Sequence, residues 1–259
     1  ILMLLDKKNI IVVGGSSGIG RSAVKAFLNE GAFLTVIGRN SKKLLAVEID
    51  LGNNGITIKG DASNPETINT AIKQSLHKFG DLHGLYHVAG GSGREKGDGP
   101  IHEISDKAWD YTTSINLDSI FYSNRAIIQQ FINQGKGGTI LNMSSVLGFS
   151  PSSKFFSTHA YASTKAAVIG LSKSLASYYS KYNIRINVIS PGLIATPMSE
   201  RAQSNTNIKS YIKQKQSLDG GRIGQALDLD GAATYFMSDK SIFTTGQVLS
   251  VDGGWSVNG

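Results

Sequence analysis

Short apolar runs rich in Ile, Val and Leu alternate with amphipathic stretches along most of the chain. The apolar runs predict buried strands, because parallel strands that are covered on both faces carry few polar residues. The amphipathic stretches repeat their apolar positions at helical spacing and predict helices. We predict strands at residues 9–13, 32–37, 56–59, 82–88, 139–143, 184–189 and 247–251.

This alternation of strands and helices indicates the fold class. Helices are predicted after Gly18 (ending at Gly31), from a cap at Ser41, and at residues 65–79, 106–134, 160–181 and 226–237. Right-handed crossovers then give an α/β fold with a seven-stranded, doubly wound parallel sheet flanked by helices. Residues 106–134 form one helix or two that meet near residues 114–116, and residues 196–224 carry no predicted element. We find no linker or repeat, which predicts a single domain over residues 1–259.

Composition narrows the class of protein. Hydrophobic residues make up 40% and charged residues 17%, which is typical of a globular protein. The absence of cysteine excludes disulfides and thiolate metal sites, and no metal site is predicted. A reducing compartment suits such a chain, so we expect a cytoplasmic protein. The apolar start, residues 1–5, is too short for a signal peptide or a membrane span, so no membrane partner is expected.

The net charge of +7 raises the question of a nucleic-acid partner. The basic residues are scattered, and the longest Lys/Arg runs are the pairs Lys7-Lys8 and Lys42-Lys43. No basic stretch is interleaved with aromatic residues that would stack on bases. The charge therefore favours phosphorylated or acidic small molecules, and no nucleic-acid binding is predicted.

A glycine-rich loop follows the first predicted strand and precedes the first predicted helix. Its glycines, Gly14, Gly18 and Gly20, are spaced G-x-x-x-G-x-G rather than G-x-G-x-x-G. Bare backbone at a helix N-terminus can bind a pyrophosphate, which predicts a dinucleotide site. A tight strand-to-helix turn is the structural alternative.

The end of the second strand bears on the choice of cofactor. NAD-binding proteins of this kind carry an acidic residue about 20 residues after the loop, where it binds the adenosine ribose. Gly38 stands at that position here, and Arg39 follows it. A guanidinium binds a 2′-phosphate that a carboxylate would repel. We therefore predict NADP(H) as the preferred cofactor, with NAD(H) as the alternative. Arg39 as a solvated surface residue is the other explanation.

Tyr161 and Lys165 are candidates for proton transfer. Residues four apart lie on one face of a helix, so both side chains point the same way. A nearby cation favours the phenolate, which predicts a lowered tyrosine pKa. On spacing alone, a solvated pair is the more frequent case.

Several motifs in order resemble those of the short-chain dehydrogenase/reductase family, in its shorter single-domain form. The glycine loop is similar to the family's cofactor loop, and Asp61 matches the acid that contacts adenine. Residues 191–196 match the segment along the nicotinamide, and residues 245–247 and 252–254 resemble the C-terminal signature. The resemblance covers essentially the whole chain and implies a Rossmann fold.

The resemblance also implies the residues of the site. The catalytic residues are expected to be Asn116, Ser145, Tyr161 and Lys165. The cofactor-binding residues are expected to be Gly14, Ser16, Ser17, Gly18, Ile19, Gly20, Arg39, Asp61, Ala62, Ala89, Gly90, Tyr161, Lys165, Pro191, Gly192, Ile194 and Thr196.

The implied reaction is hydride transfer between nicotinamide and a carbonyl or secondary alcohol. Tyr161 would act as general acid or base, and Lys165 would lower its pKa and hold the nicotinamide ribose. Ser145 would bind the substrate oxygen. Asn116 would hold a water that passes protons to Lys165.

The chain also departs from the family's pattern. Val13 replaces a frequent Thr, and His87-Val88 replaces Asn-Asn before the retained Ala-Gly. We interpret His87 as a hydrogen-bonded core residue, with bracing of the central strand as its other role. Residues 146–160 form a longer loop than usual and are expected to wall the substrate pocket. In this loop, His159 would touch substrate or cap the helix entrance.

Three functions remain open from the sequence. One is reduction of 3-oxoacyl thioesters on acyl carrier protein, an acidic partner that Lys136 and Lys181 would receive. Another is dehydrogenation of a sugar, polyol or other small secondary alcohol. An anionic substrate would then meet Arg94 or Lys96, unless these residues serve only loop solubility. The third, of another class, is a non-catalytic NADP-binding sensor or scaffold.

We also expect a homotetramer, as is common in the family, built through residues 106–134 and 160–181 and the C-terminal strands. Apolar side chains in the first of these regions would supply the contact surface, unless the core claims them. These are Ile120, Phe121, Ile127, Ile128 and Phe131.

Overall fold

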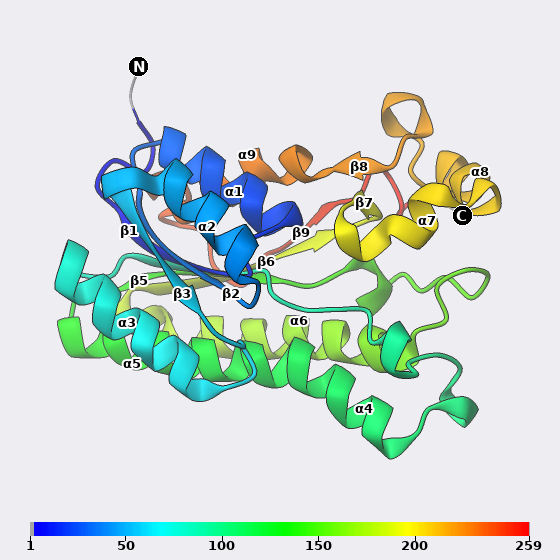
Figure 1. Ribbon diagram of the computed structural model, residues 1–259, viewed down its shortest axis with the longest axis horizontal. Coiled ribbons are helices and arrows are strands. Elements are labelled where there is room, and N and C mark those ends of the chain that lie inside the picture. Colours follow the sequence, from blue (N-terminus) through cyan, green and yellow to red (C-terminus); the bar gives the residue numbers. More distant parts are fainter. Residues whose placement is uncertain (1–2, 259) are drawn as a thin grey trace.

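A parallel sheet forms the centre of the protein (Figure 1). The computed structural model describes residues 3–258, so the start of the apolar segment at residues 1–5 lies partly outside the described residues. Within that range seven strands pair in the order β3-β2-β1-β4-β5-β6-β9, and every neighbouring pair is parallel. This confirms the predicted doubly wound sheet. The strands are β1 (Asn9–Val13), β2 (Phe33–Gly38), β3 (Gly55–Lys59), β4 (Gly84–His87), β5 (Gly138–Met143), β6 (Ile184–Pro191) and β9 (Val248–Val251).

Helices cover both faces of the sheet (Figure 1). One face carries α1 (Gly18–Asn29), α2 (Ser41–Leu51) and α9 (Asp230–Met237). The other carries α3 (Pro65–Phe79), α4 (Asp106–Thr113), α5 (Ser119–Gln134) and α6 (His159–Tyr179). No helix within residues 3–258 is long and apolar enough to cross a membrane.

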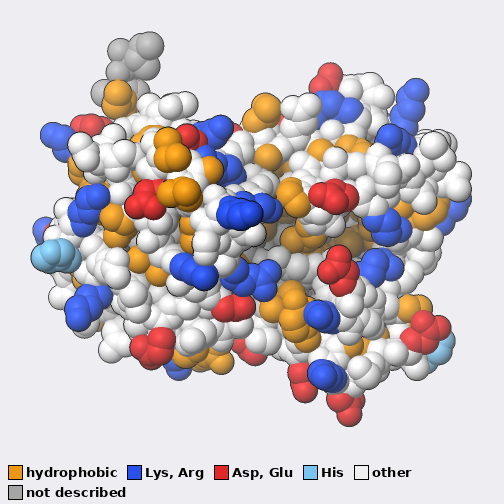
Figure 2. Space-filling model, viewed as in Figure 1, with side chains coloured by type: hydrophobic (Ala, Val, Ile, Leu, Met, Phe, Trp, Pro, Cys, Tyr) orange, Lys and Arg blue, Asp and Glu red, His pale blue; other side chains and the backbone are white. Residues whose placement is uncertain are grey.

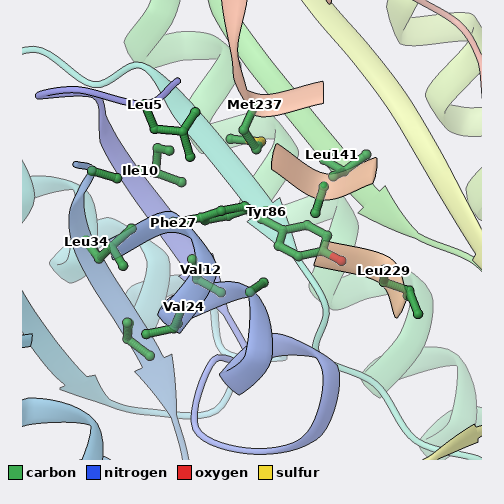
Figure 3. Close-up of a cluster of buried hydrophobic side chains, with 14 of the residues drawn as sticks. Leu5, Ile10, Val12, Val24, Phe27, Leu34, Tyr86, Leu141, Leu229 and Met237 are labelled. Carbon is green, nitrogen blue, oxygen red and sulfur yellow. The ribbon is translucent and has the colours of Figure 1, made fainter. Parts of the chain in front are cut away.

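Strand β1 supplies both hydrophobic cores, because successive strand side chains point to opposite faces. Ile10 and Val12 pack with Phe27 and Tyr86 on the α1 side (Figure 3). The rings of Phe27 and Tyr86 lie 5.9 Å apart between centroids. Residues 11 and 13 pack on the α3, α5 and α6 side. Each such apolar side chain contributes about 1.5–3 kcal/mol on burial.

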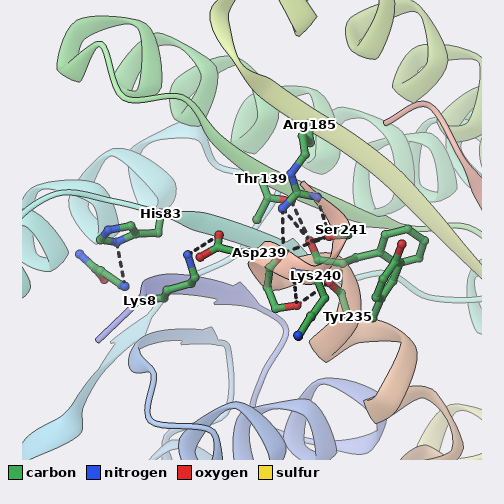
Figure 4. A network of polar contacts seen from close by, with 11 residues as sticks. Lys8, His83, Thr139, Arg185, Tyr235, Asp239, Lys240 and Ser241 are labelled. Carbon is green, nitrogen blue, oxygen red and sulfur yellow. Dashed lines mark hydrogen bonds and ion pairs between the residues drawn. The ribbon is translucent and has the colours of Figure 1, made fainter. Parts of the chain in front are cut away.

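The amino ends of the strands are tied by polar contacts (Figure 4). Arg185 of β6 donates to Ser241 Oγ at 2.7 Å and to the carbonyl oxygens of Phe236 and Ser238 at 3.2 Å. Lys8 pairs with Asp239 at 2.8 Å. These contacts fix α9 and the turn after it against β1 and β6, at the edge of the sheet away from the carboxyl ends of the strands.

Some local predictions were wrong. Strand β4 spans four residues rather than residues 82–88. Asn40, not Ser41, caps α2, because its side chain accepts a hydrogen bond from Lys43 N at 3.0 Å. By contrast, the predicted alternative of two helices that meet near residues 114–116 is confirmed, because a π-helical turn, Ser114–Asp118, joins α4 to α5. The predicted helix at residues 226–237 begins as the 3-10 turn Ala226–Leu229, and α9 starts only at Asp230.

The segment without a predicted element also has structure. It contains α7 (Glu200–Ser204) and α8 (Thr206–Lys215), and a small parallel pair, β7 (Ile194–Ala195) with β8 (Gly224–Gln225), lies at its two ends. Only a few of its side chains, including Ile208 and Ile212, are fully buried, in a separate cluster with Trp255. Short helices with so few apolar positions give a weak periodic signal.

Candidate active site

A cavity of about 610 Å³ opens at the carboxyl ends of the strands. Its walls come from the ends of β1 to β6, from α6, and from the segment after β7. Figure 2 shows its mouth as a hollow to the right of centre. All expected cofactor-binding residues except Gly20 line this cavity, as do Ser145, Tyr161 and Lys165. Asn116 and Gly20 are the two expected site residues that do not line it.

The glycine loop allows two close backbone approaches. Gly14 has φ +87°, and a Cβ there would lie 2.7 Å from Ala89 N. A Cβ on Gly20 would lie 2.3 Å from Gly14 O, so Gly20 permits the first turn of α1 to pack on the loop. At the N-cap of this helix, Ser17 makes no side-chain capping bond. The first-turn N–H groups of α1 therefore face the cavity without a side-chain partner, which fits a pyrophosphate.

Arg39 and Asp61 line the end of the cavity where the sequence predicts adenine, called here the adenine end. Arg39 is 67% exposed in its side chain, and its Nη1 lies 3.6 Å from Asp61 Oδ2. Burial opposes ionisation of Asp61, but hydrogen bonds from Ser63 and the charge of Arg39 outweigh it and lower its pKa. Gly38 is required beside them, since a Cβ there would lie 2.7 Å from Ser16 Oγ. A cation and an acceptor thus stand where a ribose and adenine would bind.

Tyr161 and Lys165 lie on the cavity-facing side of α6. The Lys165 Nζ donates to Met143 O at 2.9 Å and lies 5.5 Å from the centroid of the Tyr161 ring. Lys165 is 2% exposed, and burial lowers its pKa to about 8. Burial raises the pKa of Tyr161 to about 12, although a hydrogen bond with Ser145 opposes this.

The expected lowering of the Tyr161 pKa by Lys165 is therefore not what the structure gives. Desolvation of the phenol raises its pKa, and the contact that opposes this is the hydrogen bond with Ser145 rather than the charge of Lys165. Tyr161 is protonated at neutral pH, the state required of a proton donor.

Asn116 lies within the π-helical turn and is fully buried. Its Nδ2 donates to Gly91 O at 2.8 Å and Thr112 O at 2.9 Å, while its Oδ1 accepts from Gly91 N at 3.0 Å. The side chain therefore braces the loop after β4. A Cβ on Gly90 would meet Asn116 Oδ1 at 2.6 Å and Lys165 Nζ at 3.4 Å, so the three groups are neighbours. A water that passes protons to Lys165 would have to bind elsewhere on Asn116.

Asp98 is a residue of the site that sequence reasoning missed. It is 3% exposed, and its two oxygens accept hydrogen bonds from Ala160 N at 3.0 Å and Tyr161 N at 2.8 Å. Thr158, at the N-cap of α6, makes no side-chain capping bond. Asp98 therefore caps the helix that carries Tyr161 from a loop about 60 positions earlier. No local pattern reveals such a cap, because those patterns join residues two or three apart.

The two histidines singled out from the sequence have structural contacts. His87 is fully buried, with Nδ1 2.7 Å from Ser123 Oγ and Nε2 3.4 Å from Ser119 Oγ. Burial and the charge of Lys165 lower the pKa of His87 to about 3, so the ring is neutral. This confirms the hydrogen-bonded core histidine, which joins β4 to α5. His159 does not line the cavity, and its Nδ1 accepts from Ile101 N at 3.0 Å.

Aromatic and polar residues line the side of the cavity formed by the loop of residues 146–160 and by α7. Phe156, from the loop of residues 146–160, packs edge-on against Trp255 with centroids 5.6 Å apart. The Trp255 Nε1 donates to Ser150 O at 3.1 Å. The expected wall is thus formed in part by that loop. Other lining residues at this end are Ser92, Arg94, Glu95, Leu147, Thr158, Met198, Ser199, Glu200, Arg201 and Ala202. Within residues 3–258, no group of three or more His, Asp or Glu side chains could hold a metal ion.

Comparison with known proteins places this geometry in a family. A family model described as enoyl-(acyl carrier protein) reductase matches residues 13–256. An L-rhamnose-1-dehydrogenase of Scheffersomyces stipitis is 35% identical over 98% of both chains. A 2-dehydro-3-deoxy-D-gluconate 5-dehydrogenase of Dickeya dadantii is 29% identical over 97% of this chain and 96% of that protein.

Solved structures agree with these matches. A short-chain type dehydrogenase/reductase from Mycobacterium ulcerans has a TM-score of 0.89 at 29% identity, covering 98% of this chain and 91% of the other. The cavity at the strand ends, the glycine loop and these likenesses over nearly the whole chain lead to one assignment. The chain belongs to the short-chain dehydrogenase/reductase family of NAD(P)(H)-dependent oxidoreductases, which act on CH–OH and C=O groups.

Proposed function

We propose that the protein is an NADP(H)-preferring dehydrogenase of a sugar or a related polyhydroxy alcohol. The observation that carries this proposal is the wall formed by Ser145, Tyr161 and Lys165. These residues line the same cavity as the glycine loop and as the aromatic and polar residues around Phe156. Such an arrangement puts a proton donor between a dinucleotide site and a substrate site.

The side chains divide the chemistry among them. A bound nicotinamide supplies or accepts the hydride. Tyr161, protonated at neutral pH, gives its proton to the carbonyl oxygen in reduction. In oxidation the phenolate form of Tyr161 takes the proton from the hydroxyl, so this direction is favoured as pH rises. Ser145 donates a hydrogen bond to the same oxygen and stabilises its developing charge. Lys165 keeps a positive charge beside the Tyr161 phenol while the charge on the phenol oxygen changes.

The preference for NADP(H) is supported by the adenine end of the cavity. Arg39 is exposed and lines the wall, and no acid replaces Gly38 beside it. Asp61 lies 3.6 Å from Arg39 and neutralises its guanidinium only in part. A 2′-phosphate would compete with Asp61 for this guanidinium. NAD(H) is the alternative cofactor.

The substrate class is supported by the other end. The hydroxyl-bearing residues Ser92 and Thr158 line the cavity together with the aromatic residues Phe156 and Trp255. Hydroxyl partners and flat apolar rings together suit a polyhydroxy ring, which offers both polar and apolar faces. The names of the two related enzymes, an L-rhamnose and a deoxygluconate dehydrogenase, point to the same class.

The alternative of an acyl carrier protein substrate loses its support from the lysines. Lys136 is ion-paired with Asp81, and Lys181 lies over the Tyr178 ring at 4.2 Å. They precede β5 and β6, respectively, at the amino ends of the strands. The cavity opens at the carboxyl ends, so neither lysine would receive a carrier that delivers its thioester to Tyr161.

Turnover separates an enzyme from a non-catalytic NADP-binding protein. The wild type should oxidise members of a panel of aldoses, alditols and sugar acids with NADP⁺, monitored by NADPH absorbance. Tyr161→Phe should lower kcat by about 10³-fold or more, because the proton donor is lost, and bind NADPH nearly as well as the wild type. Retained activity in this variant would overturn the proposed mechanism. NADPH binding without turnover of any ketone or alcohol by the wild type would favour the sensor.

We further propose a cytoplasmic homotetramer. Of the five apolar residues expected at the interface, four belong to the core and only Phe121, 44% exposed, remains at the surface. Tyr178 on α6 (57% exposed) and Phe243 before β9 (fully exposed) offer further apolar surface. Light scattering after size exclusion should give four times the chain mass, and Phe121→Glu should reduce it.

A further inference from the structure

Two arginines border the substrate end of the cavity from elements far apart in the sequence. Arg94 lies in the 3-10 turn Arg94–Lys96 in the loop after β4, and Arg201 lies in α7. Both line the cavity, together with Phe156, Thr158 and Tyr161. The end of the cavity at which we place the substrate therefore carries two positive charges, and the proton donor Tyr161 lines the same cavity.

The protein does not neutralise these two charges with an ion pair. No carboxylate within residues 3–258 forms an ion pair with Arg94 or Arg201. Asp98 lies near enough to raise the pKa of Arg94, but both of its oxygens accept hydrogen bonds from the first N–H groups of α6. Glu95 and Glu200 also line the cavity, and both are exposed to solvent.

The two cations also act on each other. Burial and the charge of Arg201 both lower the pKa of Arg94, which indicates that the two guanidinium groups repel each other and that an anion between them would relieve this repulsion. Arg201 is exposed, and it is held by a hydrogen bond to Phe155 O at 3.1 Å and by a contact of its guanidinium with the Phe156 ring, 6.0 Å from the centroid. These contacts restrict the side chain, which lowers the ordering cost of binding a ligand with its remaining N–H groups.

We propose that Arg94 and Arg201 bind an anionic oxygen group of the substrate, so that the enzyme acts on acidic sugars in preference to neutral ones. The planar guanidinium matches a carboxylate or a phosphate with two parallel hydrogen bonds. The carboxylate of a sugar acid and the phosphate of a sugar phosphate share this chemistry. The inference rests on the proposed function, because it takes the substrate to be a polyhydroxy compound.

Steady-state kinetics on matched substrates provide the test. D-Gluconate and D-glucose 6-phosphate are compared with D-glucose and D-glucitol, using the wild type, Arg94→Gln and Arg201→Gln. We expect each variant to lower kcat/KM for the anionic substrate by about 10- to 100-fold, mainly through KM, because a charge-assisted bond is lost. Neutral substrates should change by no more than about twofold. A higher kcat/KM for D-gluconate would identify the bound anionic group as a carboxylate, and a higher kcat/KM for D-glucose 6-phosphate would identify it as a phosphate.

Lys96→Gln is the matched control. Lys96 lies in the same 3-10 turn and is exposed, but it does not line the cavity. The Lys96→Gln substitution removes one positive charge, as the two arginine substitutions do, but leaves the proposed subsite unchanged. Equal losses in Lys96→Gln and Arg94→Gln would indicate a general charge effect and overturn the inference.

Binding separates this inference from the proposed function. D-Gluconate and D-glucose 6-phosphate are titrated by calorimetry into the NADPH-saturated protein and its two Gln variants. Binding that weakens about tenfold or more in the variants supports the subsite even if no sugar is turned over. Turnover of neutral sugars combined with anion affinities that the variants do not change, or with no anion binding, would overturn the subsite and leave the proposed function standing.

Discussion

The buried charge of Lys165 serves the proposed reaction but destabilises the folded protein. Replacing Lys165 should show by how much. Its side chain is 2% exposed, and its pKa is lowered by burial from 10.5 to about 8. At about 1.36 kcal/mol per pKa unit, this shift destabilises the folded protein by about 3 kcal/mol at neutral pH. Lys165→Met keeps the length and volume of the side chain and removes the charge. The bond to Met143 O, worth about 1 kcal/mol, is lost as well. We expect the variant to be about 2 kcal/mol more stable at pH 7 and to lose activity.

The pH dependence gives the sign of the effect. Because the pKa of Lys165 in the folded protein lies below its value in the unfolded chain, the unfolded chain binds more protons between pH 8 and 10.5. The wild type therefore gains stability relative to the variant as pH rises through this window. The advantage of Lys165→Met should be fully present below about pH 8 and should disappear towards pH 10.5.

Urea unfolding of the cofactor-free proteins, followed by circular dichroism at equal protein concentration, measures this difference. Lys173→Met is the control, since Lys173 is an exposed lysine of the same helix and should change stability by less than about 0.5 kcal/mol. A stability difference between wild type and Lys165→Met that stays constant from pH 7 to pH 10.5 would refute the reasoning. It would mean that the pKa of Lys165 is the same in the folded protein as in the unfolded chain, as expected for a solvated side chain.

Three further predictions concern other parts of the site. Arg39→Ser should lower kcat/KM with NADP⁺ by about 10- to 100-fold and leave NAD⁺ nearly unchanged; an equal loss with both cofactors in parallel assays would contradict the role in 2′-phosphate binding. Asp98→Asn should lower thermal stability by about 1–2 kcal/mol, since it weakens both bonds to the start of α6, and should lower kcat more than the Kd for NADPH changes. Unchanged kcat in Asp98→Asn would show that Tyr161 needs no such cap. Gly20→Ala should abolish soluble folding or NADPH binding, because its Cβ would lie 2.3 Å from Gly14 O. The control Gly170→Ala has open space around its Cβ and should be neutral or stabilising by about 1 kcal/mol in denaturation experiments.

The sequence by itself determined the features that depend on neighbouring residues. Alternation of apolar strands and amphipathic helices gave the doubly wound sheet, because side-chain periodicity follows local backbone geometry. The glycines at positions 14, 18 and 20 indicated the cofactor loop, since close backbone approach requires the absence of a Cβ. The spacing of Tyr161 and Lys165 placed both on one side of α6, where they do face the cavity.

Only the tertiary structure decided the features that depend on distant segments. Asp98 caps α6 from another loop, and Arg201 reaches the cavity from a segment with no predicted element. Burial raises the pKa of Tyr161 although Lys165 is its neighbour, a balance that spacing alone does not reveal. The physical reason is the same in each case: desolvation and long-range hydrogen bonds depend on everything packed around a group, whereas a sequence pattern records only what lies within a turn or two of the chain.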